Sequence, residues 1–213
     1  MTASPLFTVN FSKRNAIKSI AAYAIFAGAT GLLVACSPEE KPQFKSIDLT
    51  GADYATGFAL ADQNGQQRSM KDFAGKIVIV FFGFTQCPDV CPTSMAELAQ
   101  IKKAMGTDGD KLQVVFITVD PERDTPELLK AYMGNFDPTF IALRPTLEQL
   151  PQVAKDFKIY YKKVEGKTPG GYSMDHSAGS YVYDPKGNIR LYSRYGNDVQ
   201  GLTSDFRLLL KSA

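Results

Sequence analysis

Two cysteines lie four positions apart in the segment Phe84-Thr85-Gln86-Cys87-Pro88-Asp89-Val90-Cys91-Pro92. An apolar run over 77–82 precedes the segment, and a stretch typical of a helix follows it over 93–105. The N-terminus of a helix carries partial positive charge and unpaired N–H groups, which favour a thiolate over a thiol. Because the thiolate is both the nucleophile and the metal ligand, the pair predicts either thiol–disulfide chemistry or a metal site.

The chain contains one histidine, His176, in Tyr172-Ser173-Met174-Asp175-His176-Ser177-Ala178-Gly179. We expect a mobile, Gly-rich loop over 165–171 before it, and we expect His176 itself to stand in a loop that overhangs the sheet edge from which Cys87 and Cys91 emerge. Two thiolates and one imidazole form a soft ligand set that suits Cu(I) and, with a further ligand, Cu(II) or zinc.

The spacing of the cysteines leaves both chemistries open. Redox pairs of the thioredoxin type are spaced C-x-x-C, whereas this pair is C-x-x-x-C. Pro88 and Pro92 disfavour a regular helix through the whole motif, which places Cys87 in the entering loop and Cys91 near the first helical turn. That geometry permits a disulfide as well as a shared metal ion.

The elements that must position these side chains alternate between strands and helices. The continuous apolar run over 77–82 predicts a strand buried on both faces, Thr125-Pro126 is a helix start, and Pro151 is expected to delay or kink its helix. We predict strands over 58–60, 77–82, 112–119, 139–143, 159–164, 180–183 and 189–192, and helices over 93–105, 126–135, 146–157 and 198–211. This order predicts an α/β, thioredoxin-like fold with a central mixed sheet flanked by helices.

The first residues differ in composition from the rest. Residues 1–35 contain Lys13, Arg14 and Lys18, no acidic residue, and an uncharged run from 19 to 35. Leu33-Val34-Ala35-Cys36 resembles a bacterial lipobox, so we predict a lipoprotein-type signal peptide over 1–35 with Cys36 lipidated. An uncleaved membrane anchor is the alternative. A polar linker over 36–54 and a copper-binding domain over 55–213 would follow, held at the bacterial cell membrane and facing the periplasm or the exterior.

The overall composition is that of an ordinary globular protein. Of its residues, 44% are hydrophobic and 22% are charged. A length of 213 residues is enough for one domain with a hydrophobic core. The formal net charge of +2 comes from the basic first segment, and the remainder is close to neutral. Nothing in this balance favours a nucleic-acid partner.

Three motifs together resemble the SCO/SenC family: Gly83-Phe84-Thr85-x-Cys87-Pro88-Asp89-Val90-Cys91-Pro92, Thr118-Val119-Asp120-Pro121-Glu122-Arg123-Asp124-Thr125-Pro126, and Asp175-His176-Ser177-Ala178. The resemblance runs from about Phe58 to the C-terminus. Residues Ser173 and Met174 depart from those that relatives commonly carry, without touching the motif's histidine.

The resemblance implies a function and a set of site residues. It implies copper as the bound metal, held by Cys87, Cys91 and His176, with Asp120 in a supporting position. It also implies delivery of copper during assembly of the CuA centre of cytochrome c oxidase. The partners would be the CuA-bearing subunit, a copper donor, a thiol reductant and the membrane, and the protein would be a carrier more than an enzyme.

A second function stays open on the same residues. The pair Cys87 and Cys91 could act as a thiol–disulfide oxidoreductase that keeps the copper-receiving cysteines of the oxidase reduced. A peroxidase or an inert interaction module would leave the motif around His176 unexplained.

Overall fold

The computed structural model of the protein describes residues 43–166 and 171–212. The predicted signal peptide, the lipidation site Cys36 and the first part of the predicted linker lie outside these residues, as does part of the predicted mobile loop. Among the described residues, no helix combines the length and the apolar character that crossing a bilayer requires.

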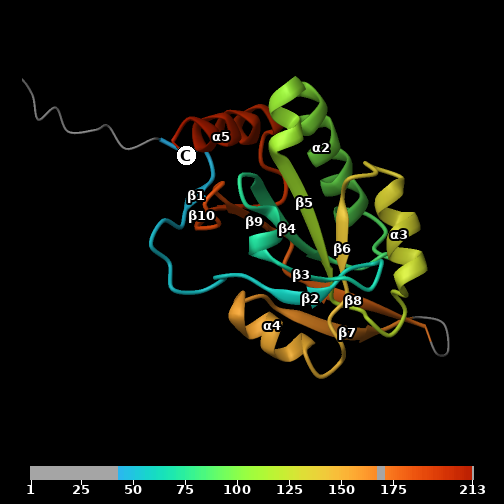
Figure 1. Cartoon of the computed structure of the whole chain (residues 1–213). Helices are drawn as coiled ribbons and strands as arrows, with labels where there is room; N and C mark the ends of the chain where they lie inside the picture. Colours follow the sequence, from blue (N-terminus) through green and yellow to red (C-terminus); the bar gives the residue numbers. More distant parts are fainter. Residues whose placement is uncertain (1–42, 167–170, 213) are drawn as a thin grey trace, which may run out of the picture. The chain divides into compact units, whose positions relative to one another are not determined.

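A six-stranded mixed sheet in the order β1-β10-β9-β4-β5-β6 forms the centre of the fold, as predicted (Figure 1). Strand β4 is parallel to β5 and antiparallel to β9, and β5 is parallel to β6. The strands of this sheet are β1 (Ile47–Asp48), β4 (Ile77–Gly83), β5 (Leu112–Thr118), β6 (Ile141–Leu143), β9 (Ser180–Tyr183) and β10 (Ile189–Ser193).

Helices and two small hairpins surround this sheet. In Figure 1, α5 lies beside α2 at the top of the view and α4 lies at the bottom, beyond β2 and β3. The helices are α2 (Val90–Ala104), α3 (Pro126–Gly134), α4 (Leu150–Asp156) and α5 (Val199–Lys211), with 3₁₀ turns η1 (Met70–Phe73) and η2 (Gly106–Lys111); the hairpins pair β2 (Ala59–Ala61) with β3 (Gln67–Ser69) and β7 (Tyr161–Glu165) with β8 (Tyr172–His176).

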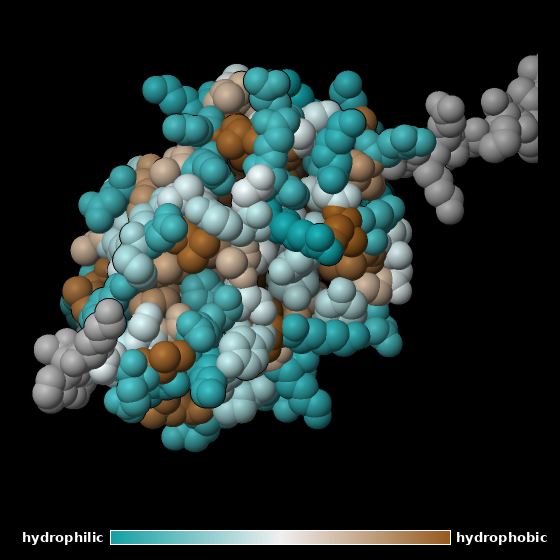
Figure 2. All heavy atoms as spheres, turned by 180° about the vertical axis from the view of Figure 1, so that it is seen from behind, coloured by the Kyte–Doolittle hydropathy of each residue, from teal (hydrophilic) through white to brown (hydrophobic). Residues whose placement is uncertain are grey.

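The core explains why the central strands are continuously apolar. Every residue of β4 and β5 is buried, because both faces of these strands are covered. On the face shown in Figure 2, exposed apolar side chains form separate small areas among hydrophilic ones. The register pairs Gly83 with Thr118, so β4 and β5 end level at one edge of the sheet. The loops that carry Cys87 and Asp120 therefore leave the sheet side by side.

Two helix boundaries follow from proline. Helix α4 begins at Leu150 with Pro151 in its first turn, which confirms the predicted delay, since proline is tolerated there but not farther inside. Helix α2 begins at Val90, three residues earlier than predicted. Its first turn includes Cys91 and Pro92, because proline is tolerated in the first turn of a helix. Cys91 is thus a helical residue and Cys87 lies in the loop before it.

The predicted linker over 36–54 is wrong at its C-terminal end. Residues Ile47–Asp48 form β1 and pair with β10 at the sheet edge. Before them, the backbone N–H groups of Lys45 and Ser46 each donate to the buried Asp205 carboxylate at 2.8 Å. The polar composition of the segment concealed the partly buried side chains Phe44 and Leu49, which pack against the core.

The predicted loop around His176 is also corrected. Residues Tyr172–His176 form strand β8, which pairs antiparallel with β7 and places Tyr161 opposite His176. One further hydrogen bond extends the pairing beyond His176, because the Ser177 N–H donates to the Tyr160 carbonyl at 3.0 Å. The histidine is therefore held at the end of a strand.

Candidate metal centre

The two cysteines lie just beyond the end of β4. The Cys87 N–H donates to the Phe84 carbonyl at 3.2 Å, which turns the chain sharply between the strand and α2. The exposed fraction is 8% for Cys87 and 0% for Cys91. Both are free thiols. Cys87 therefore lies at the mouth of the site and Cys91 at its floor.

His176 completes the group from the other side. Its Nε2 atom lies 3.5 Å from the Cys91 sulfur, and its Nδ1 atom lies 3.0 Å from the Ser177 carbonyl oxygen. A carbonyl oxygen only accepts hydrogen bonds, so Nδ1 carries the proton and Nε2 of the neutral ring keeps a free lone pair. The ligating atoms of Cys87, Cys91 and His176 all lie within 4.8 Å of one another. One metal ion can thus reach all three.

Aromatic rings fix the orientation of the imidazole. Phe84 and Phe81 each meet the His176 ring edge to face, with ring centroids 5.8 Å and 6.2 Å away. Contacts of this geometry are favourable for aromatic pairs and leave few orientations to the ring. The bare Nε2 atom is therefore held towards the sulfurs without a metal.

The two thiols have opposite acidities. The Cys91 thiol donates a hydrogen bond to the Cys87 sulfur, and this bond is the main reason why the pKa of Cys87 falls to about 4. Burial opposes this fall, and hydrogen bonds from the N–H groups of Asp89 and Cys91 add to it. The same thiol–thiolate bond and burial raise the pKa of Cys91. Cys87 is the thiolate of the pair at neutral pH.

The supporting residue Asp120 is buried and is not among the three ligating groups. Its carboxylate accepts a hydrogen bond from Tyr172 Oη at 2.8 Å and another from Arg123 Nε. Arg123 also donates to the Tyr172 carbonyl at 2.8 Å and to Gln86 Oε1 at 3.0 Å. Asp120 and Arg123 therefore join the loop after β5 to β8 and to the cysteine loop.

A second carboxylate, Asp124, was missed by the sequence analysis. It is fully buried and accepts hydrogen bonds from the N–H and hydroxyl groups of Thr85 at 3.1 Å and 2.6 Å, and from the Thr118 hydroxyl. Burial raises the pKa of Asp124, and the threonine hydrogen bonds oppose this rise. Asp124 thus anchors the start of the cysteine loop to the end of β5. Its place in the second motif was the available signal.

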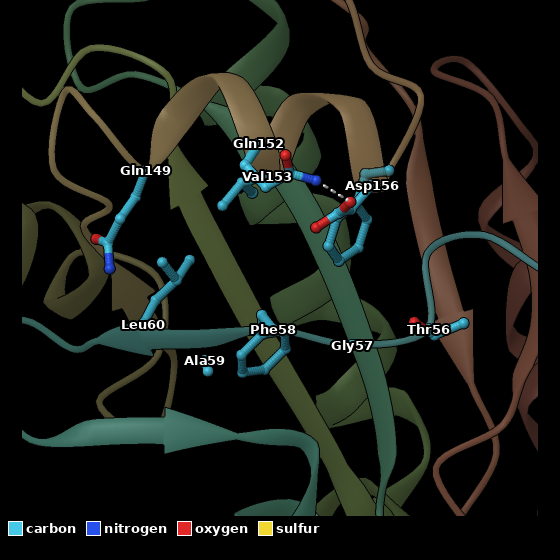
Figure 3. A pocket seen from close by; sticks show the side chains of 10 residues that line it. Thr56, Gly57, Phe58, Ala59, Leu60, Gln149, Gln152, Val153 and Asp156 are labelled. Carbon is cyan, nitrogen blue, oxygen red and sulfur yellow. Dashed lines mark hydrogen bonds between the residues drawn. The ribbon is translucent and has the colours of Figure 1, made fainter.

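A different groove lies between the segment Thr56–Leu60 and helix α4 (Figure 3). Its polar side chains include Gln152, which donates to Asp156 at 2.6 Å. The described residues that line it include no cysteine or histidine. Among the described residues, the thiol and imidazole groups that could bind a metal ion therefore lie at the cysteine–histidine group and not in this groove.

Comparison with known proteins agrees with these motifs. The family model described as SCO1/SenC matches residues 48–211, which is most of the chain. This chain belongs to the SCO1/SenC family. A SCO2-like protein of Rickettsia felis is 35% identical over 178 residues, which cover 81% of this chain and 87% of the relative.

Solved SCO structures share the fold of this SCO1/SenC protein. The structure of Bradyrhizobium japonicum ScoI with copper bound is 39% identical, has a TM-score of 0.65, and matches 72% of this chain and 97% of that chain. A SCO1/SenC family lipoprotein from Bacillus anthracis is 28% identical, has a TM-score of 0.59, and matches 72% of this chain and 92% of that chain. The predicted thioredoxin-like fold is confirmed.

We predict that Gly83→Ala disturbs the site of this SCO1/SenC protein. A Cβ atom at Gly83 would lie 2.8 Å from the Cys91 sulfur and 2.7 Å from the Phe116 ring, both too close. The variant should lose about 1–3 kcal/mol of unfolding free energy in urea titrations, a typical cost of overpacking, and should bind a soft metal more weakly. Gly134→Ala is the control, since its Cβ would meet nothing within 4 Å. Equal metal affinity in the two variants would contradict the prediction.

We also predict that Cys87 is alkylated as a thiolate down to low pH. The rate with iodoacetamide, followed at Cys87 by peptide mass spectrometry, should stay level as the pH falls and should halve near the pKa of Cys87, at about 4. In Cys91→Ala the S–H donor is gone, so the midpoint should move up towards the ordinary thiol pKa. A midpoint near the ordinary thiol value in the reduced wild type would rule out the thiol–thiolate bond.

Proposed function

We propose that this protein is a copper carrier that binds one copper ion through Cys87, Cys91 and His176. The observation that carries the proposal is the convergence of two sulfurs and a bare imidazole nitrogen within 4.8 Å. Thiolate and imidazole ligands suit Cu(I), and Cu(II) is accessible with a further ligand. The copper-bound structure of the relative ScoI supports copper as the metal.

The position of the site suits transfer of the ion to another protein. A shallow depression opens over Cys87 and His176 and is lined on its rim by Pro88, Val90 and Tyr160. The Tyr160 side chain is 57% exposed. A partner that docks on this rim can offer its own ligands to the ion while Cys91 still holds it from below. We propose the CuA-bearing subunit of cytochrome c oxidase as this partner, with a separate copper donor upstream.

Asp120 is proposed as the supporting residue. It is not one of the proposed copper ligands but holds Arg123 and Tyr172, and through them the strand that carries His176. Partners of this kind orient a ligand and contribute to metal affinity without touching the ion.

The proposed location is the outer side of a bacterial membrane, with lipidated Cys36 as the anchor after removal of a signal peptide over 1–35. The lipobox-like Leu33-Val34-Ala35-Cys36 and the Bacillus anthracis lipoprotein of the same family support this proposal. Oxidising conditions outside the cytoplasm favour a Cys87–Cys91 disulfide, so a thiol reductant is needed as a further partner.

A second function on the same residues is thiol–disulfide exchange, and the lowered pKa of Cys87 favours it. The Cys87 thiolate would attack a client disulfide and release one client thiolate. Cys91 would then attack the mixed disulfide, release the second client thiol and leave a Cys87–Cys91 disulfide. Two electrons pass to the client, and the external thiol reductant restores the pair.

Anaerobic Cu(I) titration against a chelator tests the carrier proposal. The reduced protein should bind one equivalent, the Cys87–Cys91 disulfide form none, and Cys87→Ala or Cys91→Ala far less tightly. Loss of a residue that only supports a metal ligand typically costs tenfold to hundredfold in affinity. Because His176 is a proposed ligand, His176→Ala should weaken Cu(I) binding by at least that much. Ser173→Ala, an exposed neighbour on β8, is the matched control.

The same proteins distinguish the two functions. If His176→Ala binds copper as tightly as Ser173→Ala, the three-ligand site is refuted. Turnover of a disulfide client by wild type and His176→Ala alike, without stoichiometric copper binding, would instead favour the oxidoreductase.

A further inference from the structure

Met174 lies beside the cysteine–histidine group and is not one of its three ligating residues. It stands on β8 two positions before His176 and two after Tyr172. Side chains two apart on a strand point to the same face. On this strand that face meets the cysteine and Asp120 loops, because His176 contacts Cys91 and Tyr172 bonds to Asp120.

The surroundings of Met174 agree with this direction. Its exposed fraction is 9%, and it belongs to the same buried cluster as Cys87. Met174, Cys87 and His176 line one depression at the surface. Met174 thus lies beside two of the three ligands, at the surface depression and not at the floor of the site.

The chemistry of the group leaves a place for such a ligand. Three ligating groups are brought together among the described residues, and copper accepts a fourth, weaker one. The Asp120 oxygens are already occupied by Tyr172 and Arg123. A methionine sulfur is soft, suits Cu(I) and serves as a long axial ligand to copper in other proteins, and its unbranched side chain moves easily.

We infer that the Met174 thioether is a fourth, weak copper ligand at the mouth of the site. This inference rests on the proposed copper function. The thioether binds when the ion is loaded and is the ligand that an incoming partner displaces first, since it is neutral and lies on the open side. It stabilises the loaded state without adding charge.

Copper-edge X-ray absorption on selenomethionine-labelled protein loaded with one Cu(I) tests the inference. Wild type should show selenium in the first shell of copper, and Met174→Leu, which keeps an apolar side chain of similar size, should lose it. Met95→Leu is the control, because Met95 follows Cys91 by four residues on α2 and is fully buried. It should keep the selenium shell.

The affinity of Met174→Leu for Cu(I) should fall about tenfold, comparable to loss of a supporting partner. A fully loaded wild type with only sulfur and nitrogen in the first shell would overturn the Met174 ligand and leave the three-ligand site intact. Loss of the selenium shell in Met95→Leu alone would overturn it too. Failure of the wild type to bind Cu(I) would overturn the carrier proposal together with the inference.

Discussion

The structure depends on one constraint: a sulfur from the start of α2 and an imidazole from β8, 85 residues apart, must meet before any metal is present. Proteins solve this by holding ligands with a second layer of contacts. Here β4 and β5 end at the same level, and Gly83 has no side chain that would displace the Cys91 sulfur. The ion pair of Asp120 and Arg123 holds β8. Each of these features restricts a movement of the backbone or side chains that would separate Cys91 from His176.

Hydrogen bonding between the two thiols gives the pair its chemical character. One shared proton makes Cys87 a thiolate and keeps Cys91 a thiol, and a soft metal ion would displace that proton. The same arrangement could supply a nucleophile and a resolving thiol, so the proposed metal binding and the proposed disulfide exchange use the same two residues. The histidine separates the two proposed functions, because disulfide exchange needs no imidazole beside the two sulfurs.

Much of the fold could be predicted from the sequence because the central strands are buried on both faces and read as continuous apolar runs, as 77–82 does. Cys87 and Cys91 could be placed since proline restricts the start of a helix. The strand at 172–176 was missed although Tyr172, Met174 and His176 alternate with polar residues, a period-two pattern. The glycines before it indicated a loop and outweighed that pattern.

Other features could not be predicted, because they exist only between distant segments. Asp124 reaches Thr85 across 39 positions, and Asp205 binds the chain at Lys45 and Ser46 across about 160. No local pattern identifies the distant groups that donate to a buried carboxylate. The short strand β1 is likewise defined by its partner β10 and not by its own two residues.

The central claim is that Cys87, Cys91 and His176 hold one copper ion together. Because the chain has one histidine, ¹⁵N spectra of its imidazole contain a single pair of ring signals that needs no assignment by mutation. Without metal, the proton should be on Nδ1, which donates to the Ser177 carbonyl, and Nε2 should be bare. One equivalent of Cu(I) should then shift the Nε2 signal while Nδ1 keeps its proton. Ring signals that stay in place in the fully copper-loaded protein would contradict the account.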